Sequence, residues 1–181
     1  MSLLSLLKQY LFRQSLTAPA PEAAYNLWAE SYDMQPDNLM LALDEALFSA
    51  LIKNSNWKNK VIADVGCGTG RHWKKILMKE PEKLLGYDVS EEMLKKLQEK
   101  FPKAKTYQLN NNHLPGSKNE SCDIIISTLA IAHIENIKEA FSEWNRVLKT
   151  NGEIFITDYH PVALSRGGNR TFRHNEKLIA V

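Results

Sequence analysis

The stretch VIADVGCGTGRH, residues 61–72, decides the fold of this chain. An apolar run, VIADV, leads into a segment in which Gly66, Gly68 and Gly70 occupy alternate positions. Glycine gives up side-chain packing and costs backbone entropy, so it is expected only where bare backbone is needed. A tight turn with close helix–strand packing needs only one or two glycines. Three in five residues indicate a loop on whose bare backbone a ligand lies. The stretch therefore predicts a buried strand, a ligand-binding loop and a helix.

Strand and helix patterns alternate from this stretch onward. Strands are expected in VIADV, KLLGYDV, AKTYQL, CDIIIST and EIFITDY, with helices near residues 72–79, 90–101 and 135–149. Ser90 is the expected N-cap of the second helix, because a serine side chain there accepts from a free backbone N–H. Such alternation predicts an α/β fold, a Rossmann-like three-layer α/β/α sandwich with a mostly parallel sheet.

The residues before the glycine stretch read as helices. AAYNLWAESYD (23–33) predicts a short aromatic helix, and residues 38–52 are apolar on much of their circumference, which predicts a buried helix. Leu4, Leu7 and Leu11 predict a surface or lid helix rather than a signal peptide. We divide the chain into an N-terminal helical cap (1–55), a cofactor-binding core (56–160) and a C-terminal tail (161–181).

Composition narrows the class of protein. With 181 residues, 44% hydrophobic and 24% charged, the chain has the make-up of one globular domain. A net charge of +2 is too small to indicate nucleic acid through bulk electrostatics, and no apolar stretch is long enough to span a bilayer. Two cysteines give no disulfide framework, so we expect a cytoplasmic protein.

Two acidic residues identify the kind of ligand. Asp64 stands beside the glycines, and Asp88 closes the next strand about twenty residues on, where a carboxylate can accept from ribose hydroxyls. A dinucleotide site reads G-x-G-x-x-G, whereas this loop reads acid-x-G-x-G-x-G. A carboxylate beside the loop would repel a diphosphate but would attract a ligand that carries an ammonium group. An adenosine joined to an amino acid therefore satisfies both acids better than a dinucleotide does.

Five blocks in this order resemble the class I S-adenosylmethionine-dependent methyltransferases, and more narrowly their small-molecule branch. They are VIADVGCGTGRH, LLGYDVSEEML, QLNNNHLP, CDIIISTLAIAHI and RVLKTNGEIFITDYHP, and they span roughly residues 22–161. The resemblance implies methyl transfer from S-adenosyl-L-methionine to a small-molecule acceptor.

The resemblance also implies roles for individual residues. Asp64 and the backbone of Gly66, Cys67, Gly68 and Gly70 would hold the methionyl part, and Asp88 the ribose. Val89 and Met93 would pack on the adenine, Asn110 would meet its amino group and the Asn111 N–H its ring nitrogen. Thr128 and Leu129 would lie along the methionyl side, while Tyr32, together with Trp28, would close over the sulfonium. Asn110 replaces the usual aspartate of the family, and a neutral amide oxygen is a weaker acceptor.

Candidate bases lie after the last two strands of the pattern. His160 and His133 are the candidates for a general base, ahead of Asp158, although a histidine in such a place is more often structural. Methyl transfer needs a base only if the acceptor must lose a proton. The five histidines lack metal-site spacing, so no metal is expected.

The C-terminal part is short for this family, whose sheet usually ends with two further strands. The tail reads as a loop with one strand in TFRHNEKLIAV, so the fold looks truncated, lacking the last two of seven strands. An exposed sheet edge would then favour a homodimer or a disordered end. Two alternatives to a methyltransferase stay open: a non-catalytic cofactor-binding remnant and an NAD-dependent oxidoreductase.

Overall fold

The computed structural model describes residues 19–35, 38–160, 162, 171–175 and 177–181. Its main sheet has five parallel strands in the order β3-β2-β1-β4-β5, which confirms the predicted α/β fold. The strands are β1 (Val61–Val65), β2 (Lys83–Asp88), β3 (Lys105–Gln108), β4 (Cys122–Thr128) and β5 (Leu148–Thr157). The predicted helix around Leu4, Leu7 and Leu11 lies outside the described residues.

Strand β1 lies at the centre of the sheet, and its register sets the geometry of the site. Asp64 is paired with Gly86 of β2 on one side and with Ile126 of β4 on the other. All five strands run the same way, so their carboxyl ends share one edge of the sheet. This edge brings Asp64, Asp88 and Thr128 from three strands toward one another.

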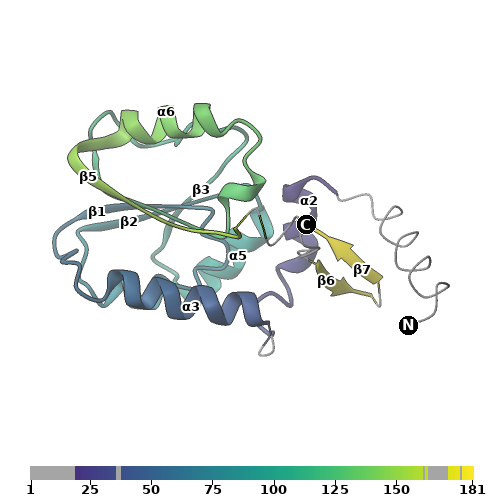
Figure 1. Cartoon of the computed structure of the whole chain (residues 1–181). Helices are drawn as coiled ribbons and strands as arrows, with labels where there is room; N and C mark the ends of the chain where they lie inside the picture. Colours follow the sequence, from purple (N-terminus) through teal and green to yellow (C-terminus); the bar gives the residue numbers. More distant parts are fainter. Residues whose placement is uncertain (1–18, 36–37, 161, 163–170, 176) are drawn as a thin grey trace.

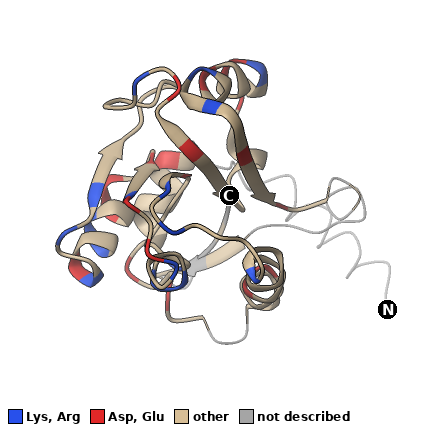
Figure 2. Ribbon diagram, turned by 90° about the vertical axis from the view of Figure 1, so that its left-hand side faces the viewer, with Lys and Arg blue, Asp and Glu red and all other residues tan. Residues whose placement is uncertain are grey.

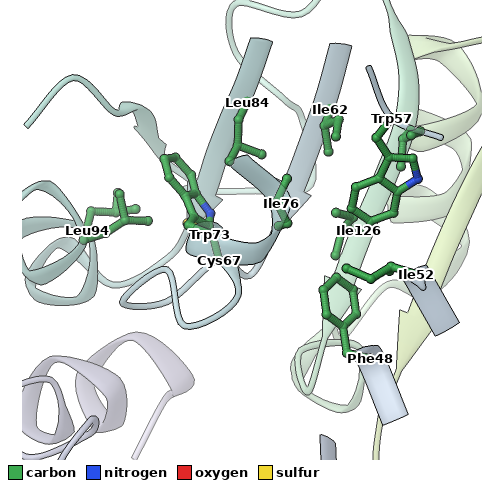
Figure 3. Packing of buried hydrophobic residues seen from close by; sticks show 12 residues of the cluster. Phe48, Ile52, Trp57, Ile62, Cys67, Trp73, Ile76, Leu84, Leu94 and Ile126 are labelled. Carbon is green, nitrogen blue, oxygen red and sulfur yellow. The ribbon is translucent and has the colours of Figure 1, made fainter. Parts of the chain in front are cut away.

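Helices cover both faces of the sheet and bury a core on each. Helices α3 (Leu39–Ile52), α4 (Trp73–Leu77) and α5 (Glu91–Lys100) contribute to one core, and α6 (Ile137–Val147) to the other (Figure 1). Three tryptophans anchor the cores, Trp57 and Trp73 below the sheet and Trp144 above it. Figure 3 shows Trp73 and Trp57 packed with the apolar residues of β1, β2 and β4. The predicted three-layer sandwich is confirmed.

Local capping explains where the helices begin. The hydroxyl of Ser90 accepts from the backbone N–H of Met93 at 3.1 Å, which confirms the predicted N-cap of α5. Glu91 and Glu92 stand in the first turn of this helix, where a carboxylate stabilises the positive end of the helix dipole. Helix α3 is capped in the same way by Asn38, whose side chain accepts from Leu41 N at 3.2 Å.

Helix α3 differs from the prediction, because it is not buried on most sides. Leu39, Leu43, Leu47 and Leu51, spaced by four residues, are 70%, 54%, 61% and 47% exposed. The inward side carries Phe48 and Ile52 but also the buried Asp44. The helix therefore turns an acid inward and a leucine stripe outward. Its sequence pattern could not reveal this, because the partners of Asp44 lie far along the chain.

The C-terminal tail forms two strands where one was predicted. β6 (Thr171–His174) and β7 (Lys177–Ala180) pair antiparallel as a separate hairpin and do not extend the main sheet. The hairpin lies beside α2 (Pro21–Trp28), as Figure 1 shows. Phe172 of β6 stacks on Trp28 of α2, with ring centroids 4.7 Å apart and planes 6° from parallel. The tail is thus an added layer on the N-terminal helix.

Surface charge is mixed over the described part of the chain. Basic and acidic residues alternate on helices and loops (Figure 2), in keeping with a net charge of +2. None of the helices within the described ranges has the length and apolarity needed to cross a membrane.

Candidate active site

The glycine loop bends away from β1 through three residues in the left-handed region. Gly66, Gly68 and Gly70 have φ values of 77°, 51° and 72°, where a side chain is strained. The N–H groups of Gly66 and Cys67 both donate to the carbonyl of Tyr87, at 2.7 and 3.0 Å. The loop is therefore hydrogen-bonded to the end of β2 rather than free.

The three glycines meet different surroundings. A Cβ on Gly66 would overlap the Cβ of Ala130, and one on Gly70 would lie 2.9 Å from Leu97 Cγ. A Cβ on Gly68 meets no described atom within 4 Å. Gly66 and Gly70 are thus required by packing, whereas Gly68 presents bare backbone to open space. The middle of the loop can accept a ligand.

Asp88 closes this loop from β2. Its Oδ2 accepts from Gly68 N at 2.7 Å and its Oδ1 from Ser90 N at 2.9 Å. The carboxylate is 7% exposed, and burial raises its pKa although both N–H groups favour the charged form. The acid predicted for the ribose is therefore oriented by two backbone donors.

Asp64 is more deeply buried. It accepts from the indole N–H of Trp73 at 2.8 Å, and burial raises the pKa of its carboxyl to about 7. A carboxylate in such surroundings gains from a bound cation, because the one indole N–H offsets only part of its lost hydration. Cys67 is buried beside it, and burial raises the pKa of the thiol well above its ordinary value. The sulfur therefore packs as a small apolar group, as expected.

Acidic side chains outnumber basic ones around the site. Burial is the main cause that raises the pKa of the Tyr32 hydroxyl. The negative charges of Asp33, Asp44 and Asp88 raise this pKa further, and the positive charge of Arg71 lowers it. Asp88 and Asp44 likewise raise the pKa of Asp64, and Arg71 lowers it. Several acids thus act on the same space, two of them paired with cations: Asp44 with Arg71 and Asp33 with Lys100. Such a field favours a positively charged ligand.

The predicted adenine-side residues lie at the ends of β2 and β3. Val89 is half-buried and its carbonyl accepts from Gln108 Nε2 at 3.1 Å. Asn110 and Asn111 follow β3 and are exposed, with the Asn111 side chain accepting from His113 N at 2.9 Å. Both asparagines thus lie at the carboxyl edge, and the ring-facing roles given to them remain predictions.

The residues after β4 border the loop on its other side. Thr128 ends β4, and Leu129 has a φ of 54°, unusual for a side chain of this size. The N–H of Leu129 donates to the carbonyl of Thr157 at 2.7 Å, which ties the end of β4 to that of β5. The next residue, Ala130, packs against Gly66. This turn therefore forms one wall of the loop.

Helix α2 lies across the edge of the sheet. Asn26 Oδ1 accepts from Ser90 Oγ at 2.7 Å and from Glu92 N at 3.3 Å, which docks α2 on the start of α5. At the other side, the hydroxyl of Tyr25 lies 3.1 Å from Nε2 of His133. The helix therefore bridges the two sides of the predicted cofactor site.

An aromatic cluster fills the space beneath α2. Trp28 lies edge-on to Tyr32, with ring centroids 4.9 Å apart, and is 1% exposed. Met93 is fully buried in the same cluster as Trp28 and Phe172, so here its side chain contacts α2 and the hairpin. Tyr32 belongs to the turn after α2 rather than to the helix itself.

The two candidate bases have different surroundings. His133 ends the short 3-10 helix η1 (Ile131–His133) and is held by Tyr25. His160 is exposed, and its Nδ1 accepts from Val162 N at 3.3 Å. Asp158 links the segments after β4 and β5: it directly follows β5, and its Oδ2 accepts from the N–H of Ala132, after β4, at 3.0 Å. Across the described ranges, no group of three or more His, Cys, Asp or Glu residues could hold a metal ion.

Three site residues were missed from the sequence. Asp33 accepts from the hydroxyl of Thr69 in the loop at 2.7 Å, and Asn26 caps α5. Asp44 on α3 holds Arg71 and His72, the two residues after the loop. The one sequence signal was Asp44 itself, an acid in a mostly apolar helix, although the neighbouring Glu45 gives the same signal.

The residues present fit the adenosine-linked amino acid expected from the sequence. Beside the Cβ position of Gly68 there is open space, the buried Asp64 stands just before the loop, and the buried Asp88 is hydrogen-bonded to the middle of the loop. These features accommodate a ligand with an ammonium group, a sulfonium and a ribose diol.

Comparison with known proteins agrees with this geometry. Residues 63–156 match the family model described as "Methyltransferase domain", just over half of the chain. An uncharacterized protein of Haemophilus influenzae is 30% identical over 129 residues, covering 67% of this chain and 51% of its own length. A malonyl-[acyl-carrier protein] O-methyltransferase of Hamiltonella defensa is 29% identical over 153 residues, covering 84% of this chain and 57% of its own.

A solved structure supports the fold. The crystal structure of an S-adenosylmethionine-dependent methyltransferase from Mesorhizobium loti is similar with a TM-score of 0.56 and 20% identity, covering 70% of this chain and 58% of that one. The chain spans about half the length of the curated relatives it matches.

Proposed function

Because this chain belongs to the class I S-adenosylmethionine-dependent methyltransferases, we propose that it transfers the methyl group of S-adenosyl-L-methionine to a small-molecule acceptor. The observation that carries the proposal is the pairing of the glycine loop with two buried carboxylates, Asp64 and Asp88. The family assignment removes the NAD-dependent oxidoreductase. A non-catalytic, cofactor-binding protein remains the alternative.

The cofactor would bind along the carboxyl edge of the sheet. Asp64 and the backbone of Gly66–Gly70 would hold the methionyl part, and Asp88 the ribose hydroxyls. Val89, Asn110 and Asn111 would surround the adenine, and Thr128, Leu129 and Tyr32 would face the methionyl side. Met93, predicted to pack on the adenine, is fully buried with Trp28 and Phe172, so it would reach the adenine only if that packing changed. When bound, this cofactor supplies an electrophilic methyl group on a positively charged sulfur.

The protein contributes mainly by positioning. In-line displacement depends on the alignment of donor and acceptor, and a pre-oriented site supplies much of the rate enhancement. The buried acids Asp64 and Asp88, which lack an ion-pair partner among the described residues, would stabilise a positive charge held on the loop. Helix α2 would exclude water, because it lies across the site between Ser90 and His133.

We assign the acceptor to the side of the site bounded by the ends of β4 and β5. His160 and His133 both follow these strands, and either could remove a proton from the acceptor. His133 lies against Tyr25 of α2, so the docked helix also fixes the orientation of the imidazole ring. His160 is exposed and free to meet an acceptor, which favours it as the base.

The proposal is tested by following S-adenosylhomocysteine formation with the purified chain, S-adenosylmethionine and fractions of a cell extract. Fractions below about 3 kDa should support product formation, and fractions of larger molecules should not. Product formation only with the macromolecular fraction would refute a small-molecule acceptor. Binding of the cofactor without turnover in any fraction would favour the non-catalytic alternative.

We also propose a cytoplasmic, homodimeric protein. Cys67 and Cys122 are both buried and unpaired by disulfide, as a reducing compartment allows. Strand β5 forms one end of the five-stranded sheet, so in the described structure its outer edge is open to a second chain. Sedimentation as a monomer at micromolar concentration would contradict the dimer.

A further inference from the structure

Asp44 connects three separate elements through one carboxylate. It is 3% exposed, on the inner side of α3, and it accepts from Arg71 Nη2, from His72 Nε2 at 2.9 Å and from the hydroxyl of Thr157. Arg71 also donates to the carbonyl of Leu41 at 3.3 Å, so its guanidinium is fixed at two points on α3. Donors from the glycine loop's end and from β5 thus converge on a single acid.

The protonation states in this group are defined by their surroundings. Hydrogen bonds from His72, Thr157 and Arg71 outweigh burial and lower the pKa of Asp44 to about 2, so it is ionised at neutral pH. Burial lowers the pKa of His72, so the neutral ring donates from Nε2. A buried carboxylate is tolerated only with such complete pairing. Removing the charge would leave Arg71, among the described residues, with only the Leu41 carbonyl at 3.3 Å and the more distant Glu45 carboxylate at 3.9 Å.

Two of the three donors to Asp44 directly follow the cofactor loop. Gly70 is followed by Arg71 and His72, and His72 is the N-cap position of α4. At its beginning the loop is held by the Tyr87 carbonyl, and in its middle by Asp88. Asp44 holds the other end. Because glycine can adopt many backbone conformations, attachments at the beginning, middle and end of the loop select the one set of positive φ values that is observed.

Asp44 also reaches the acceptor side of the site. Thr157 is the last residue of β5, and its carbonyl accepts from Leu129 after β4. The residue after it, Asp158, accepts from Ala132 N at 3.0 Å. The carboxylate thus joins the loop on β1 to the segment from which His160 extends.

We propose that Asp44 is a positioning residue, which holds Arg71 and His72 so that the Gly66–Gly70 loop keeps its cofactor-binding conformation in register with the end of β5. The inference rests on the proposed function, because it assigns a purpose to the geometry of that same site. Asp44 acts through other residues and touches no ligand itself.

The test compares Asp44→Asn with a matched variant at the opposite edge of the sheet. Asp123→Asn is the control, since Asp123 likewise joins separate elements by hydrogen bonds: it accepts from the backbone N–H of Val61 at 2.9 Å and from Lys149 Nζ at 2.8 Å. Titration calorimetry would measure S-adenosylhomocysteine affinity, and amide NMR spectra of the ligand-free proteins would report Gly66, Gly68 and Gly70. Urea unfolding would give the stability of each variant.

Asp44→Asn should weaken S-adenosylhomocysteine binding about tenfold and shift the three glycine amide signals in the free protein. Asp123→Asn should change affinity less than twofold and leave these signals in place, even where it lowers the urea midpoint as much. If Asp44→Asn does not fold, Thr157→Val removes one of the three donors and should produce the same glycine shifts at smaller size.

The outcomes separate this inference from the proposed function. If the wild-type chain does not bind S-adenosylhomocysteine, the proposed function fails, while the glycine signals still test the role of Asp44. If the wild type binds and Asp44→Asn, or Thr157→Val in its place, binds equally with unmoved glycine signals, the positioning role is refuted. Equal effects of Asp44→Asn and Asp123→Asn on affinity would also refute it.

Discussion

The backbone N–H of Gly68 donates a hydrogen bond to Oδ2 of Asp88 at 2.7 Å. This bond joins the loop after β1, which begins just beyond Asp64, to Asp88 at the end of β2. The carboxylate predicted to hold the ribose thus also orients the loop expected to hold the methionyl part. The two halves of the cofactor site form one hydrogen-bonded unit.

Replacing Asp88 should therefore disrupt both halves at once. Asp88→Ala leaves the N–H groups of Gly68 and Ser90 without an acceptor, and hydrogen bonds to a charged group are worth about 1.5–3 kcal/mol each. Calorimetry should show S-adenosylhomocysteine affinity reduced at least thirtyfold, or about 2 kcal/mol. Glu82→Ala, an exposed acid before the other end of β2, is the control and should bind as the wild type does.

The loop glycines should separate packing from ligand binding. In Gly66→Ala the new methyl group overlaps Ala130, so the urea midpoint should fall by an amount equivalent to about 3 kcal/mol. In Gly68→Ala only the positive φ is strained, which costs about 1 kcal/mol, yet the methyl group enters the open space over the loop. Gly68→Ala should fold and lose affinity for S-adenosylhomocysteine. Equal behaviour of the two variants would contradict this division.

Cofactor affinity should depend on pH through Asp64. Its carboxyl has a pKa of about 7 in the free protein, so below pH 7 a proton must leave before the carboxylate can pair with an ammonium group. Affinity for S-adenosylhomocysteine should rise between pH 5.5 and pH 7 and level off by pH 8. Asp64→Asn should bind weakly and show no such dependence, as calorimetry across this range would reveal.

Asp64 should also make the stability of the ligand-free protein depend on pH, but stability should fall with rising pH where cofactor affinity rises. Because the folded state raises the pKa of Asp64, the folded protein holds a proton between about pH 4 and pH 7 that the unfolded chain releases. The contribution of Asp64 to stability is therefore favourable at low pH and is lost as pH rises to 7. Asp64→Asn should gain stability relative to the wild type as pH rises from 5 to 8. A constant difference would show that Asp64 does not titrate there.

The hairpin and helix α2 should be energetically coupled. Phe172 stacks on Trp28 and is 4% exposed, so Phe172→Ala removes a large buried contact from that cluster. Hydrogen exchange should become faster in α2 and at Met93, and remain unchanged in β1 and β4. Exchange that rises equally in the central strands would indicate global destabilisation instead.

The candidate bases should differ in turnover. If His160 removes a proton from the acceptor, His160→Ala should lower turnover at least a hundredfold with unchanged S-adenosylhomocysteine affinity. His133→Ala should instead loosen α2, because it removes the partner of the Tyr25 hydroxyl. Turnover of His160→Ala equal to that of the wild type would remove His160 as the base.

Much of the core could be predicted from the sequence because its signals are local. The apolar runs of β1 and β4 mark central strands, and the Ser90 cap follows from its position before an acidic first turn. The approach of Asp64 and Asp88 follows from parallel strands that end at one edge. These features depend on neighbouring residues or on a general rule of sheet topology, so no tertiary contact had to be known.

The contacts of α3 and of the tail hairpin could not be predicted, because they join residues that are far apart in the sequence. Asp44 faces inward only because Arg71, His72 and Thr157 lie there, and the same turn of the helix exposes Leu43 and Leu47. The second strand of the tail hairpin and the Phe172 stack on Trp28 likewise depend on packing between the two ends of the chain.

The central claim is that the glycine loop and its two acids hold S-adenosylmethionine. Calorimetric titration of this chain with S-adenosylhomocysteine, with NAD as the comparison ligand, tests it most directly. Micromolar binding of S-adenosylhomocysteine, lost in Asp88→Ala and absent for NAD, is the predicted result. Binding of NAD alone, or S-adenosylhomocysteine binding unaffected by Asp88→Ala, would contradict the account.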